Sequence, residues 1–375
     1  MLTEVAFEGY RSVRELRTGV GQLTVFVGKN GVGKTNLYRA LYLLHAAAAG
    51  TITREIAREG GVQSVLWAGG REDEGRQRLR LEATLGDLAY RIEVGLPALT
   101  EIAMSVEPRI REEELVQASP DGPILHMQRR SRSAVVRLPS GKRETHTNVL
   151  LASETAISAF RDASRYPAIE IVRRTLLDWR FYENFRVDGE SPIRSSCLAI
   201  STPSLAPDGH DLAATIATVL HVAEDQSALE RAVVDAFPGA RLSVNTERGR
   251  CSLAMKFADM PRQFEAQELS DGTLRYLCLI GALTGYRPPS FIALNEPEAS
   301  LHGEMLEPLA RLIAKAAERS QIWVVTHSPE LGAALQRLTG VAAHEVVKVL
   351  GATEISMAPA QAAAGQTPVR RARKA

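Results

Sequence analysis

The sequence predicts an α/β protein in which both ends of the chain build one core, with the middle of the chain as a compact α+β insertion. Near the N-terminus, a β-rich run over 20–26 leads into a glycine-rich segment and a helical run over 36–47. Beyond residue 267, continuous apolar runs alternate with amphipathic helices, which is typical of a parallel sheet covered by helices. The middle of the chain shows patterns of antiparallel strand pairs at 78–96 and 241–257.

Each further element follows from a local pattern. Residues 1–45 predict strand, loop, strand, loop and helix, and glycine pairs break up 50–75. Residues 150–235 are expected to be mostly helical, with breaks at 191–192 and 201–209. The elements expected in the C-terminal part are a helix over 273–283, a strand over 291–294, a helix over 304–317, a strand over 322–325 and a helix over 330–338.

The composition excludes several classes of protein. The 375 residues include 45 Lys plus Arg and 44 Asp plus Glu, a net charge of +1, which excludes a surface that is basic or acidic throughout but allows a local basic patch. No apolar run is long enough to span a membrane, and the first residues lack a signal-peptide pattern. The three cysteines form neither a disulfide framework nor a zinc motif. We therefore expect a cytoplasmic protein with no membrane partner.

The glycine-rich segment is a phosphate-binding loop. Residues 28–35 read Gly-Lys-Asn-Gly-Val-Gly-Lys-Thr, which fits the P-loop pattern at every position and lies between a strand and a helix. Backbone N–H groups and the helix N-terminus would hold the phosphates of ATP, Lys34 would reach the β- and γ-phosphates, and Thr35 would hold Mg²⁺. The residues expected at the nucleotide are Gly28, Lys29, Asn30, Gly31, Val32, Gly33, Lys34, Thr35 and Asn36.

Four further segments complete a pattern in the C-terminal part. Leu269–Thr273 precedes a helix, and Asn295-Glu296 follows an apolar strand. Ala299–His302 comes directly after, and His327 ends another apolar strand. A carboxylate at Glu296, beside the phosphate loop, can orient and deprotonate an attacking water.

Together these segments resemble the ABC-type ATPase head of the class that contains structural-maintenance-of-chromosomes proteins and RecF. The loop at 28–36, preceded by Phe-Glu-Gly-Tyr-Arg-Ser at 7–12, is in the style of compact RecF-like ATPases, often labelled AAA-family. Runs such as Trp-Arg-Phe-Tyr at 179–182 extend the resemblance through the middle of the chain. It implies a P-loop NTPase that hydrolyses ATP with Mg²⁺. It also implies that 269–273 is the signature loop and 299–302 the D-loop.

The resemblance assigns roles to single residues. Glu296, His327 and Lys34 are the expected catalytic residues, with His327 as the switch histidine at the γ-phosphate. Ser270 and Gly272 would bind the γ-phosphate held by the opposing subunit of an ATP-dependent homodimer, although a plain helix N-cap is the other interpretation of Ser270.

Metal binding is the least typical part of the motif set. The Walker B aspartate of the class is replaced by Asn295, whose neutral amide can still accept a hydrogen bond from metal-bound water. We therefore expect slow hydrolysis. Thr35, Asn295 and Gln63 are the expected residues at Mg²⁺, and an exposed glutamine without a metal role is the other interpretation of Gln63.

The motifs divide the chain into four parts. Residues 1–75 are expected to form the N-terminal part of the ATPase core, and 261–350 its C-terminal part. Residues 76–260 would be the insertion, a β-rich lobe followed by a helical lobe, and 351–375 a disordered basic tail.

Function is predicted at the level of a nucleotide-gated switch in DNA repair or DNA metabolism. The arginine-rich run with Arg129, Arg130 and Arg132 is the expected DNA contact. Other roles remain open: an ATPase sensor subunit that controls a separate effector in antiphage defence, or a soluble transporter ATPase, which the long insertion disfavours. A nuclease in the same chain is not expected, because too few residues follow His327 and no acidic D-x-D cluster lies among them.

Overall fold

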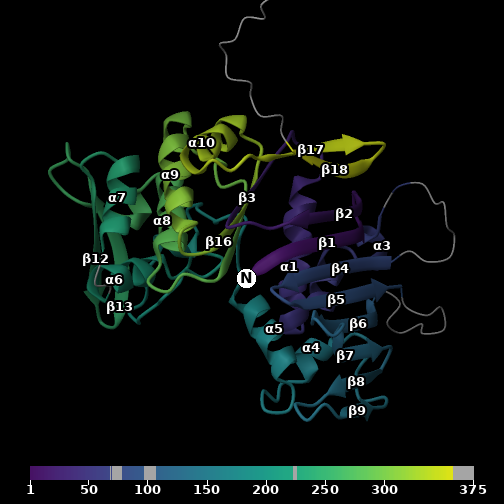
Figure 1. Ribbon diagram of the computed structural model, residues 1–375. Coiled ribbons are helices and arrows are strands. Elements are labelled where there is room, and N and C mark those ends of the chain that lie inside the picture. Colours follow the sequence, from purple (N-terminus) through teal and green to yellow (C-terminus); the bar gives the residue numbers. More distant parts are fainter. Residues whose placement is uncertain (68, 70–77, 97–106, 223–225, 358–375) are drawn as a thin grey trace, which may run out of the picture.

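The computed structural model describes residues 1–67, 69, 78–96, 107–222 and 226–357. These residues form three sheets and the helices packed on them (Figure 1). The central sheet has six strands in the order β10-β15-β16-β3-β17-β18, parallel except for the β17–β18 hairpin. Its strands are β10 (Arg180–Tyr182), β15 (Phe291–Asn295), β16 (Gln321–Thr326), β3 (Leu23–Val27), β17 (His344–Val349) and β18 (Ala352–Met357).

The other two sheets are antiparallel. The larger has eight strands: β2 (Val13–Gly19), β1 (Leu2–Tyr10), β4 (Arg78–Leu85), β5 (Leu88–Gly95), β6 (Arg109–Gln117), β7 (Ile124–Arg130), β8 (Ser133–Arg137) and β9 (Arg143–His146). The smaller joins β11 (Cys197–Leu198), β13 (Arg250–Lys256), β12 (Arg241–Glu247) and β14 (Phe264–Glu265).

The helices lie between and around the sheets. The α-helices are α1 (Lys34–Ala49), α2 (Ile52–Arg58), α3 (Val62–Val65), α4 (Ala156–Ala159), α5 (Pro167–Asp178), α6 (Leu212–Val222), α7 (Ser227–Ala236), α8 (Asp271–Thr284), α9 (Leu306–Ala316) and α10 (Pro329–Thr339). Short 3₁₀ turns occur at η1 (Pro192–Arg194), η2 (Ala266–Glu268) and η3 (Gly303–Met305).

The central sheet buries both of its faces. Alternate side chains of a strand point to opposite faces, so Phe291 and Trp323 pack with α1 and the eight-stranded sheet. Ile292 and Val324 pack on the other face with α8, α9 and α10. This two-sided burial explains why these strands are continuous apolar runs in the sequence. The predicted α/β class and P-loop NTPase architecture are confirmed, with both chain ends contributing to the central sheet.

The structure differs from the sequence prediction in three places. Strand β1 pairs with β2 on one side and with β4 on the other, so the N-terminal segment joins the same sheet as the β-rich lobe assigned to the insertion. Within 150–235, expected to be mostly helical apart from its breaks, residues 179–200 hold only β10, β11 and the η1 turn. Residues 352–357, assigned to a disordered tail, form β18, because their backbone pairs antiparallel with β17. The rest of the predicted tail, 358–375, lies outside the described residues.

Candidate functional site

The phosphate-binding loop connects β3 to α1, as the motif predicts. Gly31 and Gly33 have φ of 80° and 101°, in the left-handed region that favours glycine. A Cβ on Gly33 would lie 2.0 Å from the Thr353 Oγ1, so the loop also needs a residue without a side chain there. Helix α1 begins at Lys34, and its first backbone N–H groups are directed toward the loop.

Lys34 is a buried cation with hydrogen-bonding capacity to spare. The residue is 4% exposed, and its Nζ donates to the Lys29 carbonyl oxygen at 2.8 Å. Burial lowers the pKa of the Lys34 ammonium, while the nearby Glu296 and Glu298 carboxylates act in the opposite direction. An ammonium carries three donors, so two remain for a ligand beyond the bond to Lys29.

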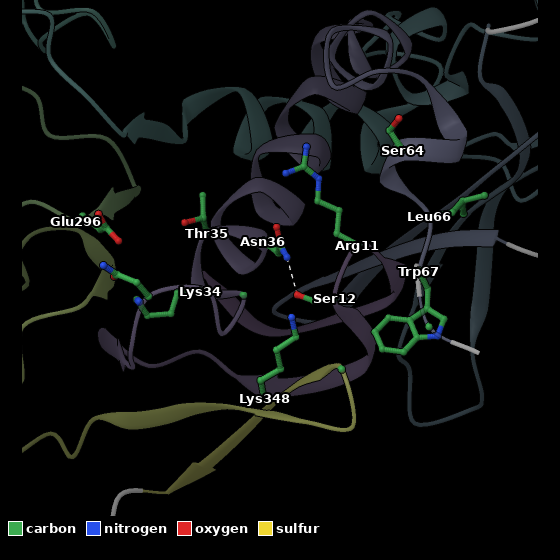
Figure 2. A pocket seen from close by; sticks show the side chains of 15 residues that line it. Arg11, Ser12, Lys34, Thr35, Asn36, Ser64, Leu66, Trp67, Glu296 and Lys348 are labelled. Atoms are coloured by element: carbon green, nitrogen blue, oxygen red, sulfur yellow. Dashed lines mark hydrogen bonds between the residues drawn. The ribbon is translucent and has the colours of Figure 1, made fainter. Parts of the chain in front are cut away.

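A cavity of about 700 Å³ opens in front of this loop. Lys34, Thr35 and Glu296 lie toward one end of it, and Trp67 lies toward the other (Figure 2). Two more cations, Arg11 and Lys348, also line it. The remaining lining residues are Ser12, Asn30, Gly31, Gly33, Asn36, Ser64, Leu66, Gly69 and Gly351.

The end of β15 places two of the predicted residues. Asn295 is buried, and its Oδ1 has no hydrogen-bond partner within the part of the chain that the structure describes. Glu296 has a φ of 48°, an uncommon value for a residue with a side chain. Its N–H donates to the Val325 carbonyl oxygen at 2.7 Å, which fixes this turn and directs the carboxylate into the cavity.

His327 lies beside Glu296 and a second carboxylate. The His327 Nδ1 is 3.7 Å from the Glu296 Oε2 and 3.0 Å from the Glu298 Oε1. His327 is not among the residues that line the cavity. It lies behind Glu296, which does line it. The sequence analysis did not assign a role to Glu298, although its position two residues after Glu296 could have suggested one.

The predicted signature loop lies at the start of α8, away from the cavity lining. Ser270 caps the helix, since its Oγ accepts from the Thr273 N–H at 3.2 Å. A Cβ on Gly272 would come within 3.3 Å of the Ser300 carbonyl oxygen, so this loop packs against the predicted D-loop. Neither Ser270 nor Gly272 lines the cavity formed by Lys34 of the same chain.

Gln63 is exposed on the short helix α3 and is not among the residues that line the cavity. Its neighbours Ser64, Leu66 and Trp67 line it instead. Within the described residues, the structure therefore does not bring Gln63 together with Thr35 and Asn295.

The phosphate loop is braced by segments from both chain ends, which the sequence analysis missed. The Thr353 Oγ1 donates to the Val32 carbonyl oxygen at 2.8 Å and lies 2.7 Å from the Ser12 Oγ. The Asn36 Nδ2 donates to the same Ser12 Oγ at 2.6 Å. Hairpin β17–β18 and the β1–β2 turn thus both contribute hydrogen bonds that position the phosphate loop beside the cavity.

The prediction that Arg129 contacts DNA is wrong. Arg129 is 0% exposed, and its NH1 pairs with the Glu113 Oε2 at 3.5 Å. Its other donors reach the carbonyl oxygens of Ser131 and Leu151. Alternation along β7 puts Arg129 on the same buried face as Met127, while Arg130 points outward. Arg130 and Arg132 are exposed.

The oxygen atoms at the loop fit a magnesium ion bound mainly through a nucleotide. No cluster of three or more His, Cys, Asp or Glu side chains placed to hold a metal occurs in the described ranges. Mg²⁺ usually takes only one or two protein ligands plus phosphate oxygens and waters. The Thr35 hydroxyl lines the cavity and suits that arrangement, while the unpartnered Asn295 Oδ1 is buried behind the lining and is not among the residues that face the cavity.

The fold resembles that of a solved SMC head domain. A crystal structure of an SMC head, "SmcHead bound to the C-winged helix domain of ScpA", matches 95% of this chain and 97% of that chain with a TM-score of 0.53 at 16% identity. The chromosome partition protein Smc of a Synechococcus species is 36% identical over 80 residues, which is 21% of this chain and 7% of that protein. The chain therefore shares the fold of an SMC head domain.

A protein-family model narrows this class. It is described as "AAA domain, putative AbiEii toxin, Type IV TA system", and it matches residues 23–122 and 151–333. The chain belongs to this family. A search of the helices within the described residues finds none with the length and apolarity to cross a membrane.

Proposed function

We propose that this chain binds and hydrolyses ATP in the cavity in front of its phosphate loop. One observation carries the proposal: Lys34 and Thr35 at the loop after β3, and Glu296 directly after β15 of the same sheet, line the same cavity. Its volume of about 700 Å³ is within the range of ligand pockets. A P-loop cation facing a strand-end carboxylate is the pair that phosphoryl transfer to water requires.

The cavity suggests how the nucleotide would lie. The triphosphate would bind at the N-terminus of α1, with Lys34 at the β- and γ-phosphates. The base would lie at the opposite end, where Trp67 offers an aromatic face (Figure 2). Arg11 and Lys348 would neutralise charge between these ends.

Hydrolysis would depend on groups at the γ-phosphate end. Glu296 would orient and deprotonate the attacking water, and His327 lies beside it. Mg²⁺, when bound by Thr35 and Asn295, would neutralise charge on the phosphates. The amide of Asn295 contributes no negative charge, so we expect weaker Mg²⁺ binding and slow turnover.

ATP would also act as a switch between two copies of the chain. The loop at Ser270 and Gly272 does not reach the cavity of its own chain, which fits a role in the cavity of a second copy. Its backbone N–H groups at the start of α8 would bind the γ-phosphate across the dimer. Binding would close the dimer, and hydrolysis through Glu296 would reopen it.

Two cellular roles are compatible with such a switch. The first is DNA repair or DNA metabolism, with Arg130 and Arg132 as the exposed basic residues that remain available for phosphate contact. The second is control of a separate effector in a defence system, which the family description, naming a toxin of a Type IV TA system, favours. ATP hydrolysis stimulated by DNA would support the first role, and stimulation by a partner protein the second.

The test of the switch is the mass of the Glu296→Gln variant in solution, measured by light scattering with and without ATP and Mg²⁺. This variant should bind ATP but not hydrolyse it, so it should shift from 40.8 kDa to roughly twice that mass. A Glu296→Gln, Ser270→Arg double variant, with a blocked signature loop, should stay at the mass of one chain. A Glu296→Gln variant that stays monomeric with saturating ATP would remove the dimer from the proposal.

A further inference from the structure

Glu298 is a buried carboxylate with an unusual set of partners. It is 6% exposed and lies two residues beyond Glu296. Its Oε1 accepts from the Thr326 Oγ1 at 2.5 Å and from the backbone N–H of His327 at 2.9 Å. The same oxygen lies 3.0 Å from the His327 Nδ1. Two hydrogen-bond donors at the end of β16 therefore converge on a single carboxylate oxygen, and the His327 Nδ1 lies within ion-pair distance of it.

These contacts fix the carboxylate in place. Thr326 is fully buried, and its hydroxyl and the His327 N–H hold the Glu298 Oε1 from two directions. A buried carboxylate without such donors would carry a large desolvation cost. The Oε2 of Glu298 has no partner among the described residues. The hydrogen bonds that offset the cost of burying this carboxylate are therefore all made to Oε1.

We propose that Glu298 is a positioning residue that holds a proton on the His327 Nδ1. A carboxylate oxygen 3.0 Å from the Nδ1 repels a lone pair on that nitrogen and attracts a proton there. In a neutral imidazole with a protonated Nδ1, the Nε2 is an acceptor. The same Nδ1 lies 3.7 Å from the Glu296 Oε2, beyond hydrogen-bond distance, so the ring that Glu298 positions also lies beside the carboxylate that lines the cavity.

This role matters because of the amide at Asn295. The end of β15 lacks a charge at Asn295, and Glu298 supplies a fixed negative group on the following turn. Together with Glu296, Glu298 acts to raise the pKa of the Lys34 ammonium, against the lowering that burial causes. Glu298 is therefore close enough to the phosphate loop to influence its charge. Its effect on hydrolysis rests on the proposed function, but its effect on His327 does not.

The test is the tautomer of His327, read from the ¹⁵N chemical shifts of the full chain labelled on its histidines. Spectra are recorded without nucleotide, well above the ordinary histidine pKa of about 6.5, and the His327 signal is assigned by its loss in His327→Gln. We expect a protonated Nδ1 and a bare Nε2. A proton on Nε2 in the unmodified protein would overturn the proposal, and this result needs no Glu298 variant to fold.

Two substitutions separate positioning from packing. In Glu298→Gln, the Thr326 hydroxyl and the His327 N–H hold the amide oxygen in the Oε1 position, so the Nδ1–H form should persist. Glu298→Met keeps similar length but offers no acceptor, so the Nδ1 proton should be lost from the neutral ring. Glu330→Met is the control, because Glu330 bonds Ser328 rather than the ring, and it should leave the tautomer unchanged. An unchanged tautomer in folded Glu298→Met would also overturn the proposal.

Turnover is measured separately on the same proteins. Glu298→Met should lower kcat roughly 10- to 100-fold, the usual cost of losing an orienting partner, with KM changed far less. Glu298→Gln should retain most of kcat. An unmodified protein with the expected tautomer but no hydrolysis would refute the proposed function and leave the effect of Glu298 on the His327 tautomer standing. Normal kcat in a Glu298→Met protein that has lost the Nδ1 proton would refute the positioning role.

Discussion

Lys34 and Arg129 are both buried cations near carboxylates, yet they differ in what surrounds them. The donors of Arg129 are directed at Glu113 and at backbone carbonyl oxygens, in the middle of the eight-stranded sheet and its helices. Within the described residues, the Lys34 side chain has one hydrogen bond, to the Lys29 carbonyl oxygen, and it lines the cavity. Both side chains are desolvated, which lowers the pKa of each.

The difference separates a structural cation from a ligand-binding one. Burying a charge is costly unless it is paired and hydrogen-bonded, and Arg129 meets that requirement within the chain. Lys34 is hydrogen-bonded to one carbonyl oxygen of the described residues, and its other N–H donors are available to an anionic ligand. Each prediction below changes one side of this comparison.

The largest effect is expected for Arg129→Ala. The substitution leaves Glu113 buried without its cation, so the free energy of unfolding should fall by about 3–5 kcal/mol. Urea unfolding followed by circular dichroism measures this. Arg130→Ala, one residue away and exposed, is the control and should change stability by less than about 0.5 kcal/mol. Equal small effects for both would contradict the structural role of Arg129.

Lys34→Ala should show the reverse pattern. Loss of charged hydrogen bonds to the phosphates should weaken ATP binding by about 1.5–3 kcal/mol or more, since several bonds are removed together. Unfolding stability without nucleotide should change little, because Lys34 pairs with only one backbone carbonyl. Calorimetric titration with ATP measures the affinity. Unchanged ATP affinity in a folded Lys34→Ala protein would place the nucleotide elsewhere.

Trp67→Ala tests the far end of the cavity. Loss of stacking on the base should weaken ATP binding by about 1–3 kcal/mol, while Trp67→Phe should retain most of it. Binding of inorganic triphosphate, which has no base, should be equal in all three proteins. A parallel loss of triphosphate affinity in Trp67→Ala would show that Trp67 supports the loop rather than the base.

The smallest effect is expected for Arg130 and Arg132. If these exposed residues bind DNA phosphates, changing both to Ala should reduce the slope of log affinity against log salt by about one for each phosphate that is no longer neutralised. Fluorescence anisotropy with labelled duplex DNA at several salt concentrations measures the slope. An unchanged slope would leave the effector-controlling role as the better proposal.

Local patterns predicted the core of this molecule well. The loop at 28–35 combines fixed glycine positions with a strand before it and a helix after it, and the buried strands β15 and β16 were visible as apolar runs. The misassignment of Arg129 was avoidable, because period-two alternation from Met127 already places it on the buried face. The clustered arginines suggested one basic surface, but the alternation of side chains along β7 puts Arg129 on the buried face and Arg130 on the exposed face.

Other parts depend on contacts between distant segments. Ser12 and Thr353 meet at the phosphate loop from opposite chain ends, and no local pattern in either segment indicates it. The same applies to Lys348 and Trp67, which enter the cavity from separate elements. Gln63 was chosen for its residue type, whereas the structure brings its neighbour Ser64 to the cavity.

The most direct test of the account is phosphate release from ATP by purified protein with Mg²⁺, compared with Glu296→Gln under conditions where both bind ATP. The account predicts slow but measurable release by the unmodified protein and a loss of roughly 10²-fold or more in Glu296→Gln, because the group that orients the water is removed. Release that is absent from the unmodified protein, or equal in the two proteins, would contradict it.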